Sequence, residues 1–213
     1  MNILKNKHIY LFDLDGTLID SSPEIIKTYN TVFNKNNIKP IREVSEDIIG
    51  PTLKDTISNL IPSKHLSNID KIIKDFIGLY DNKFCTESSL YDGVYETLDK
   101  LSKKNRLILI TNKRFIPTEK ILYSNKIINF FEKYFSVDIK SQYSFNKSSL
   151  IKNVLEEMKL DPKKTVYVGD TKEDFKASMD NNIDFIFAEY GYGKSEKNFL
   201  NKISDICELN SLS

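Results

Sequence analysis

Short, almost entirely apolar segments recur along the chain at wide intervals. Such runs are typical of strands that are buried on both faces of a parallel sheet. The runs are 8–12, 107–110, 134–139, 165–168 and 184–188. Between them, apolar residues recur every three or four positions, as in a helix with one buried side. Strands that alternate with helices predict an α/β fold, with a Rossmann-like parallel sheet core flanked by helices.

Two segments carry the helical pattern most clearly. In 148–159 the apolar residues lie on one stripe, and Val94, Leu98 and Leu101 do the same ahead of the strand at 107. Both segments directly precede or follow a predicted strand. They are therefore expected to be helices that cover the sheet.

One long interval between the first two predicted strands carries no strand pattern. Ser22-Pro23-Glu24 indicates a helix start, because proline fits the first helical turn, where its missing N–H is not needed. Gly50-Pro51 indicates a loop, after which helical periodicity resumes over 66–80. We therefore expect an inserted all-helical domain. The predicted limits are 20–87 for this insertion, and 1–19 with 88–213 for the α/β core.

Composition narrows the possible partners and compartments. The 213 residues include 31 Lys and Arg and 30 Asp and Glu, so the balanced charge argues against a nucleic-acid partner. No apolar run approaches the roughly 18 residues of a membrane span, and 9–12 is too short for a secretory signal. Cys85 and Cys207 lie far apart, which favours two reduced thiols. We expect a soluble cytoplasmic protein without membrane association, and no pattern indicates an oligomeric state.

Two aspartates directly follow the first predicted strand. In an extended segment Asp13 and Asp15 point to the same side, because side chains alternate. Neighbouring carboxylates repel unless a cation lies between them or one is protonated. The pair therefore suits a hard divalent cation, with one carboxylate left for nucleophilic or acid–base chemistry. Gly16 allows a sharp turn close to a ligand. Taken alone, however, Asp-x-Asp is more often a strand that leads into a turn.

Polar residues also follow the second and third predicted strands. Thr111-Asn112 can hold a phosphate oxygen through a hydroxyl and backbone N–H groups, although a threonine that simply closes a strand is an equal alternative. Lys147 precedes a predicted helix, where a lysine is unfavourable unless an anion lies nearby. Taken alone, a solvated surface lysine is the simpler interpretation.

The fourth predicted strand ends in Gly169-Asp170, and Asp174 follows. Thr171 and Asp174 match a capping box, which gives Asp174 a structural alternative to a functional role. Because the carboxyl ends of parallel strands meet at one edge of a sheet, the polar residues after all these strands are expected to converge. Together they offer carboxylates for a metal, and a hydroxyl and an ammonium group for phosphate.

In this order, the motifs resemble those of the haloacid dehalogenase superfamily of phosphatases. The matching segments are Asp13-Leu14-Asp15-Gly16-Thr17, Thr111-Asn112, Lys147, and Gly169-Asp170 with Asp174. The helical insertion is similar to the C1 cap of the phosphoglycolate phosphatase-like branch. The segment 90–94 resembles that branch's return from cap to core, and 191–193 its final loop.

The resemblance implies a Mg²⁺-dependent hydrolase that acts on a small phosphomonoester metabolite, phosphoglycolate-like or a sugar phosphate, through an aspartyl-phosphate intermediate. Asp13 is implied as the nucleophile, and Asp15 as the acid–base residue. The implied Mg²⁺ ligands are the Asp13 side chain, the Asp15 backbone carbonyl and the Asp170 side chain. The further implied roles are phosphoryl binding by Thr111, Asn112 and Lys147, support by Gly16 and Asp174, and a substrate contact from a cap loop at Gly50.

Several alternatives stay open at this point. A nucleotidase, a pyrophosphatase or a phosphomutase of the same superfamily would use the same motifs, although apolar Ile25 stands where the mutases carry a cap histidine. Ser148 replaces a proline that many relatives carry after the lysine. Gly193-Lys194-Ser195 fits a loosened nucleotide-binding P-loop, but Ala188 replaces its first glycine. A non-catalytic regulator on the same fold is a further alternative.

Overall fold

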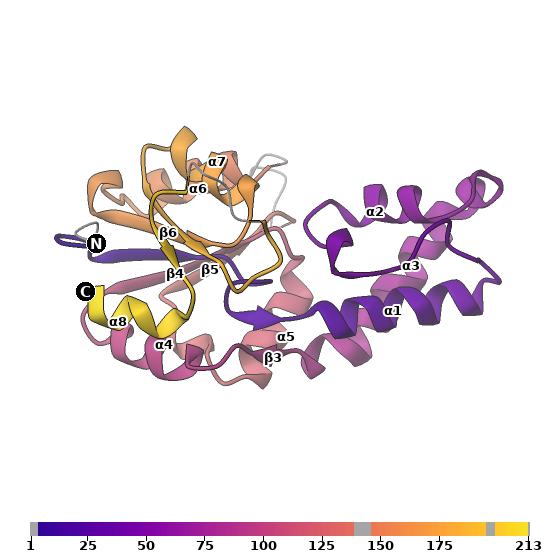
Figure 1. Ribbon diagram of the computed structural model, residues 1–213, viewed down its shortest axis with the longest axis horizontal. Helices are drawn as coiled ribbons and strands as arrows, with labels where there is room; N and C mark the ends of the chain where they lie inside the picture. The colour runs from indigo at the N-terminus through magenta and orange to yellow at the C-terminus, as the bar shows by residue number, and fades with distance from the viewer. Residues whose placement is uncertain (1–3, 139–145, 195–198, 213) are drawn as a thin grey trace. The chain divides into compact units, whose positions relative to one another are not determined.

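The structure is a computed structural model that describes residues 4–138, 146–194 and 199–212 (Figure 1). The chain forms two compact units: residues 21–88 form one, and the segments before and after them form the other. No helix in the described part of the chain is both long enough and apolar enough to cross a membrane. Neither Cys85 nor Cys207 forms a disulfide.

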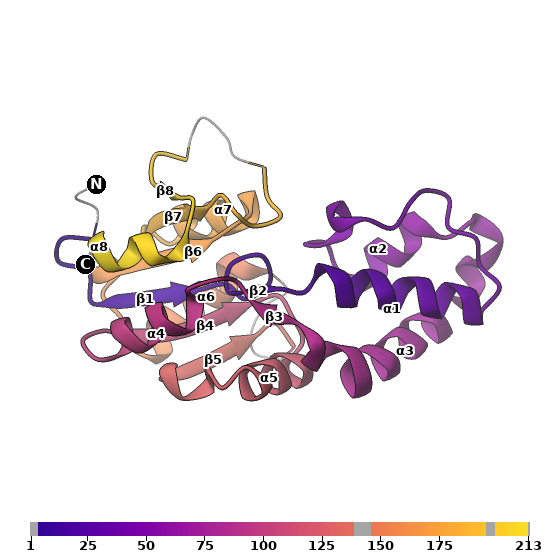
Figure 2. The same ribbon diagram turned by 60° about the horizontal axis from the view of Figure 1, so that its bottom comes forward.

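The larger unit is built on a six-stranded sheet in the order β5-β4-β1-β6-β7-β8 (Figure 2). The strands are β1 (Ile9–Phe12), β4 (Arg106–Thr111), β5 (Lys133–Ser136), β6 (Thr165–Gly169), β7 (Asp184–Ala188) and β8 (Lys202–Ile203). Every neighbouring pair is parallel. In register, Phe12 at the end of β1 lies opposite Leu109 of β4 and Val168 of β6. The carboxyl ends of the central strands therefore lie at one edge, and the predicted α/β fold is confirmed.

Helices cover both faces of this sheet, α6 and α7 on one face and α4, α5 and α8 on the other (Figure 1). Their bounds are α4 (Val94–Ser102), α5 (Phe115–Ser124), α6 (Lys147–Glu157), α7 (Lys172–Asp180) and α8 (Leu209–Leu212). The apolar stripe of α6 is buried against the strands and α7, where Leu150 and Val154 are fully covered. Asn146 caps α6, because its side chain accepts a hydrogen bond from the Ser149 N–H.

Two short features of the larger unit were not predicted. A two-stranded antiparallel ladder joins β2 (Ile19–Asp20) to β3 (Ser89–Leu90), at the points where the chain leaves and re-enters this unit. Strand β8 is equally short. Two residues are too few to show an alternating pattern. The strand expected at 134–139 ends at Ser136, and residue 139 lies outside the described residues.

The second unit consists of helices and loops. Its α-helices are α1 (Ser22–Lys35), α2 (Leu53–Leu60) and α3 (Ile69–Leu79). The shorter turns of helix are η1 (Glu46–Ile48), η2 (Ser63–Asn68), η3 (Tyr80–Phe84) and η4 (Cys85–Glu87). Helix α1 begins at Ser22 with Pro23 in its first turn, as predicted. Aromatic rings of α1 and α3 form its core, with the Tyr29 and Phe76 centroids 4.5 Å apart. The pattern expected over 66–80 begins as the 3₁₀ turn η2 and continues as α3.

Candidate active site

Asp13 lies at the edge of the sheet where the central strands end. Its backbone N–H donates to the carbonyl of Val168, 3.0 Å away, so β1 stays in register with β6 up to this residue. The chain then turns sharply, because the Leu14 carbonyl accepts from the N–H groups of Leu18 and Ile19. The Asp13 side chain is buried by this turn and by the strands beside it. The Asp13 carboxylate is therefore placed one residue beyond the end of β1, at the carboxyl edge of the sheet.

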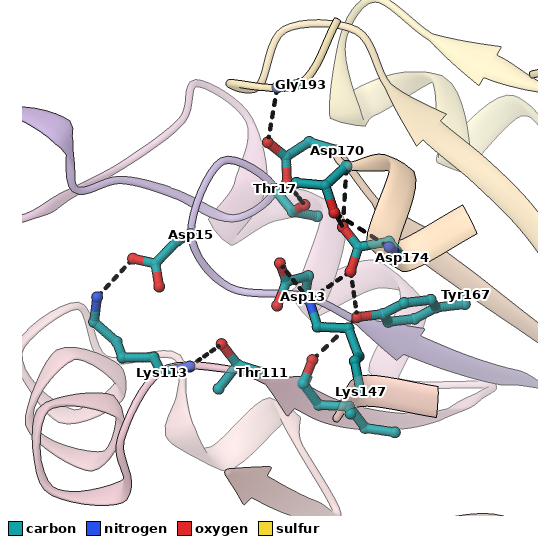
Figure 3. Close-up of polar contacts among 12 residues, drawn as sticks. Asp13, Asp15, Thr17, Thr111, Lys113, Lys147, Tyr167, Asp170, Asp174 and Gly193 are labelled. Carbon is teal, nitrogen blue, oxygen red and sulfur yellow. Dashed lines mark hydrogen bonds and ion pairs between the residues drawn. The ribbon is translucent and has the colours of Figure 1, made fainter. Parts of the chain in front are cut away.

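The two aspartates of the first motif face different partners (Figure 3). The Asp13 carboxylate points toward Lys147, whereas the Asp15 carboxylate turns toward Lys113, 2.7 Å away. Strict alternation along an extended segment would have put both side chains on the same side. Because the turn begins at Leu14, that expectation does not hold beyond Asp13.

Lys147 is buried between two carboxylates. Its Nζ lies 3.1 Å from Asp13 Oδ2 and 2.5 Å from Asp174 Oδ1. The interpretation as a solvated surface lysine is therefore wrong. Burial alone would lower the pKa of Lys147, but Asp13 and Asp174 outweigh it and raise the pKa above its ordinary value. The ammonium group stays protonated and compensates the buried negative charge.

Asp174 has both of the roles that the sequence allows. Its Oδ2 accepts from the Thr171 backbone N–H at 3.0 Å and from the Thr171 hydroxyl at 2.6 Å, which completes the capping box of α7. Its Oδ1 meets Lys147 and lies 3.1 Å from the Tyr167 hydroxyl. One carboxylate therefore fixes the start of α7 and holds the buried lysine.

Tyr167 is a site residue that sequence reasoning missed. Its hydroxyl lies 3.2 Å from the Ile110 carbonyl and 3.1 Å from Asp174 Oδ1. In the sequence, a tyrosine inside a buried strand cannot be told from an ordinary core residue, so nothing indicates that its hydroxyl belongs to the site. Its hydroxyl ties β6 to the end of β4 and to the carboxylate that holds Lys147.

The Tyr167→Phe variant is expected to lose about 1–2 kcal/mol of unfolding free energy, since buried polar groups would lose a hydrogen-bond partner. Tyr10→Phe is the matched control: Tyr10 is equally buried on the neighbouring strand, and its hydroxyl has no hydrogen-bond partner among the described residues. We expect Tyr10→Phe to be neutral or stabilising. Urea unfolding of the three proteins measures both differences, and equal losses in the two variants would contradict this assignment.

Asp170 is held by the loop that follows β7. Its Oδ2 accepts from the backbone N–H groups of Tyr192, at 2.8 Å, and Gly193, at 3.3 Å. Its Oδ1 lies 3.3 Å from the Thr17 hydroxyl. A Cβ on Gly193 would lie 1.7 Å from the Asp170 carbonyl oxygen, so only glycine fits there. In the P-loop-like segment, Gly193 thus lets the backbone pack directly against Asp170. Ser195 of that segment lies outside the described residues.

Gly16 makes a second close approach to Asp170. Its φ of 77° is in the left-handed region, and a Cβ there would lie 2.2 Å from Asp170 Oδ2. Any other residue would combine backbone strain with a collision. The expected sharp turn is therefore present, and it presses the loop after β1 against the aspartate that follows β6.

Three buried carboxylates gather at this edge. One oxygen each of Asp13, Asp170 and Asp174 lies within 4.8 Å of the others. Burial raises the pKa of Asp13 well above its ordinary value; Lys147 opposes this, and the neighbouring carboxylates add to it. Burial, followed by the charge of Asp174, raises the pKa of Asp170 to about 7. A cation between these groups would stabilise the ionised form of both carboxylates and so lower both pKa values.

The donor set fits a hard divalent cation. Asp13 Oδ1 is buried and has no hydrogen-bond partner among the described residues, whereas both oxygens of Asp174 are engaged by protein donors. Asp13 is therefore the better suited of these two side chains. Asp170 also accepts hydrogen bonds on both oxygens, but its contacts are with backbone N–H groups and a hydroxyl rather than with a lysine. Carboxylate oxygens are the ligands that Mg²⁺ prefers.

The end of β4 supplies the remaining predicted residues of this unit. Thr111 is buried, and its hydroxyl oxygen accepts from the Lys113 backbone N–H at 3.1 Å. Asn112 follows and is half-buried. Lys113, whose ammonium group meets Asp15, was not predicted. Its position just after a strand end was the signal that could have identified it.

Gly50 does not belong to the unit that contains the sheet. It is exposed in the second unit, in the loop between η1 and α2. Its substrate contact stays a prediction.

Comparison with known proteins identifies relatives over most of the chain. The family described as haloacid dehalogenase-like hydrolase matches residues 10–188. A phosphoglycolate phosphatase from Colwellia psychrerythraea is 31% identical over 204 residues, which cover 91% of this chain and 89% of that protein. The pyrophosphatase PpaX of Bacillus mycoides is 32% identical over 168 residues, or 77% of this chain and 75% of that protein. A haloacid dehalogenase-like family hydrolase from Streptococcus pneumoniae has the same fold, with a TM-score of 0.85, 22% identity, and coverage of 97% and 98%.

Proposed function

Because this chain belongs to the haloacid dehalogenase-like hydrolase family, we propose that it is a Mg²⁺-dependent phosphatase of small phosphomonoesters that uses an aspartyl-phosphate intermediate. One observation carries the proposal. The buried Asp13 carboxylate has one oxygen against Lys147, and its other oxygen has no hydrogen-bond partner among the described residues. The phosphoglycolate phosphatase relative supports a small phosphorylated metabolite as substrate. We propose the second unit, residues 21–88, as the cap domain.

The first chemical step forms a bond between an Asp13 oxygen and phosphorus, and breaks the bond between phosphorus and the ester oxygen. Asp15 gives a proton to the departing alcohol. Lys147 offsets the repulsion between the Asp13 carboxylate and the incoming phosphate, because its ammonium group already lies 3.1 Å from that carboxylate. Thr111 and Asn112, at the end of the neighbouring strand, would donate to the phosphoryl oxygens.

The second step hydrolyses the acyl phosphate. Asp15, now deprotonated, takes a proton from a water molecule, and the water oxygen attacks phosphorus. The bond between Asp13 and phosphorus breaks, which releases inorganic phosphate and restores the Asp13 carboxylate. The proton that Asp15 gave to the alcohol is thereby replaced, so each cycle consumes one ester and one water molecule.

The metal would be held by the side chains of Asp13 and Asp170 and the backbone carbonyl of Asp15. Bound there, Mg²⁺ would neutralise negative charge on the transferring phosphoryl group. Asp170 is oriented for this role by the N–H groups of Tyr192 and Gly193. Asp174 holds Lys147 in place and is not needed as a ligand.

Mg²⁺ affinity is expected to rise with pH, because protons compete for the same carboxylates. The folded pKa of Asp170, about 7, lies above the ordinary value. Without metal, Asp170 therefore stays protonated in the folded state up to about pH 7, whereas in the unfolded chain it loses its proton at about pH 4. Protonation of Asp170 thus stabilises the folded state at low pH, and this stabilisation is lost as the pH rises from about 4 to about 7. Below pH 7, competition from the Asp170 proton should lower the apparent Mg²⁺ affinity by up to about tenfold per pH unit. Calorimetric titration with Mg²⁺ between about pH 5.5 and 8 measures this; a constant affinity would contradict the assignment.

The experiment that tests the proposed function is a screen of the purified protein against phosphoglycolate, sugar phosphates, nucleoside monophosphates and pyrophosphate. We expect Mg²⁺-dependent release of phosphate, which a chelator abolishes. Pyrophosphate is included because the identity to PpaX favours pyrophosphatase as a second candidate. Release from pyrophosphate alone would select that candidate. No release from any compound, with Mg²⁺ present, would overturn the proposal and favour a non-catalytic regulator.

A further inference from the structure

A second lysine lies at the same edge of the sheet, and the steps derived above do not use it. Lys113 follows β4 by two residues, and its backbone N–H donates to the Thr111 hydroxyl oxygen at 3.1 Å. This hydrogen bond closes the turn after the strand, so the backbone of Lys113 is fixed relative to a residue of the site. The lysine therefore lies in a short hydrogen-bonded turn between β4 and α5.

The Lys113 side chain forms an ion pair with Asp15. Its Nζ lies 2.7 Å from Asp15 Oδ1, and the two side chains are only 7% and 17% exposed. Figure 3 shows the Asp15 carboxylate turned toward this ammonium group and away from Asp13. An ion pair so well covered is held more firmly than a pair at the surface, because little water competes for either charge.

The two lysines divide the carboxylates of the site between them. Lys147 meets Asp13 and Asp174, whereas Lys113 meets Asp15. The residue that attacks phosphorus and the residue that transfers protons thus each have a cationic partner, one at the start of α6 and the other in the turn after β4. Loss of Lys113 would leave the contacts of Lys147 with Asp13 and Asp174 in place.

We propose that Lys113 is a positioning residue that sets the orientation of the Asp15 carboxylate for proton transfer. This inference rests on the proposed function, since it assigns Lys113 to the acid–base half of that mechanism. The Asp15 backbone is already fixed, because the Gly16 N–H donates to the Ile19 carbonyl at 2.9 Å. The ion pair with Lys113 restricts the rotation of the Asp15 side chain.

The test compares an alkyl phosphate with p-nitrophenyl phosphate in the variants Lys113→Met and Lys113→Arg. An alkoxide leaves poorly without a proton, whereas p-nitrophenolate needs none, so only the alkyl ester depends on Asp15 in the first step. For Lys113→Met we expect kcat/KM to fall by about 10- to 100-fold for the alkyl ester and little for the aryl ester. Lys113→Arg keeps the charge and should restore much of the loss. Lys103→Met, at an exposed lysine paired with Asp99, is the control and should leave both values unchanged.

Two kinetic results would overturn the inference. Equal losses of kcat/KM for both esters would indicate a merely structural role. A rise in KM confined to esters with an anionic leaving group, such as phosphoglycolate, would make Lys113 a substrate contact. A crystal structure of Lys113→Met gives a readout that needs no activity: we expect the Asp15 carboxylate to leave its present orientation, and an unchanged orientation would also overturn the inference. If wild-type protein hydrolyses neither ester, the proposed function fails, and this crystal structure still decides the positioning.

Discussion

The Asp13→Asn variant is expected to fold as the wild type does and to lose about 10⁴-fold or more in kcat. An amide oxygen is a poor nucleophile, and the two neighbouring carboxylates, Asp170 and Asp174, are both engaged by protein donors. The fold should persist, because the raised pKa of Asp13 shows that burying its ionised carboxylate is unfavourable. Replacing this carboxylate with a neutral amide removes repulsion from Asp170 and Asp174, which compensates for the weaker contact with Lys147.

Two measurements check this prediction. Steady-state kinetics on the substrate found in the screen gives the loss in kcat, and thermal unfolding shows whether the fold is kept. Asp180→Asn, at an exposed position at the end of α7, is the matched control and should change neither. Retention of substantial turnover by the purified Asp13→Asn variant would rule out Asp13 as the nucleophile.

Lys147→Met is expected to combine a large loss of stability with a large loss of activity. The methionine fills a similar volume but leaves the buried Asp13 and Asp174 carboxylates without their shared cation. Breaking a buried ion pair in this way typically costs about 3–5 kcal/mol. Activity should fall by about 10²- to 10³-fold, as when one electrostatic donor to a transition state is removed.

Lys152→Met is the matched control, because Lys152 lies on the same helix but is exposed. Urea unfolding should separate the two variants by several kcal/mol. The double variant Lys147→Met, Asp174→Asn should be less destabilised than the sum of its single changes, since the amide removes one uncompensated charge. Lys147→Met with wild-type stability would contradict the buried ion pairs.

The sequence predicted the residues that follow directly from parallel-sheet topology. Asp13 and Asp170 come from distant parts of the chain, yet each follows a short apolar run, and neighbouring parallel strands must end at one edge. The burial of Lys147 could not be predicted in the same way, because a lysine is ordinarily exposed and its partner Asp174 lies 27 residues away.

Other parts of the site leave no pattern in the sequence. Tyr167 is one of five consecutive buried residues of β6, as any core residue of a central strand is, and its hydroxyl contacts depend on tertiary packing. The position of Lys113 just after a strand end is a signal in the sequence, but its contact with Asp15 is not, because it depends on the turn after Thr111. The ladder of β2 and β3 is too short for a period. The sequence thus predicts which side chains follow the strand ends, whereas the residues that orient those side chains depend on tertiary packing.

Chemical trapping of the intermediate on Asp13 tests the central claim most directly. The enzyme is mixed with substrate and Mg²⁺, quenched in acid, and treated with borohydride, which reduces an acyl phosphate to an alcohol. Peptide mass spectrometry should then find homoserine at position 13, and only in samples that contained both substrate and Mg²⁺. Homoserine at another aspartate, or unmodified Asp13 in enzyme that is turning over, would contradict the account.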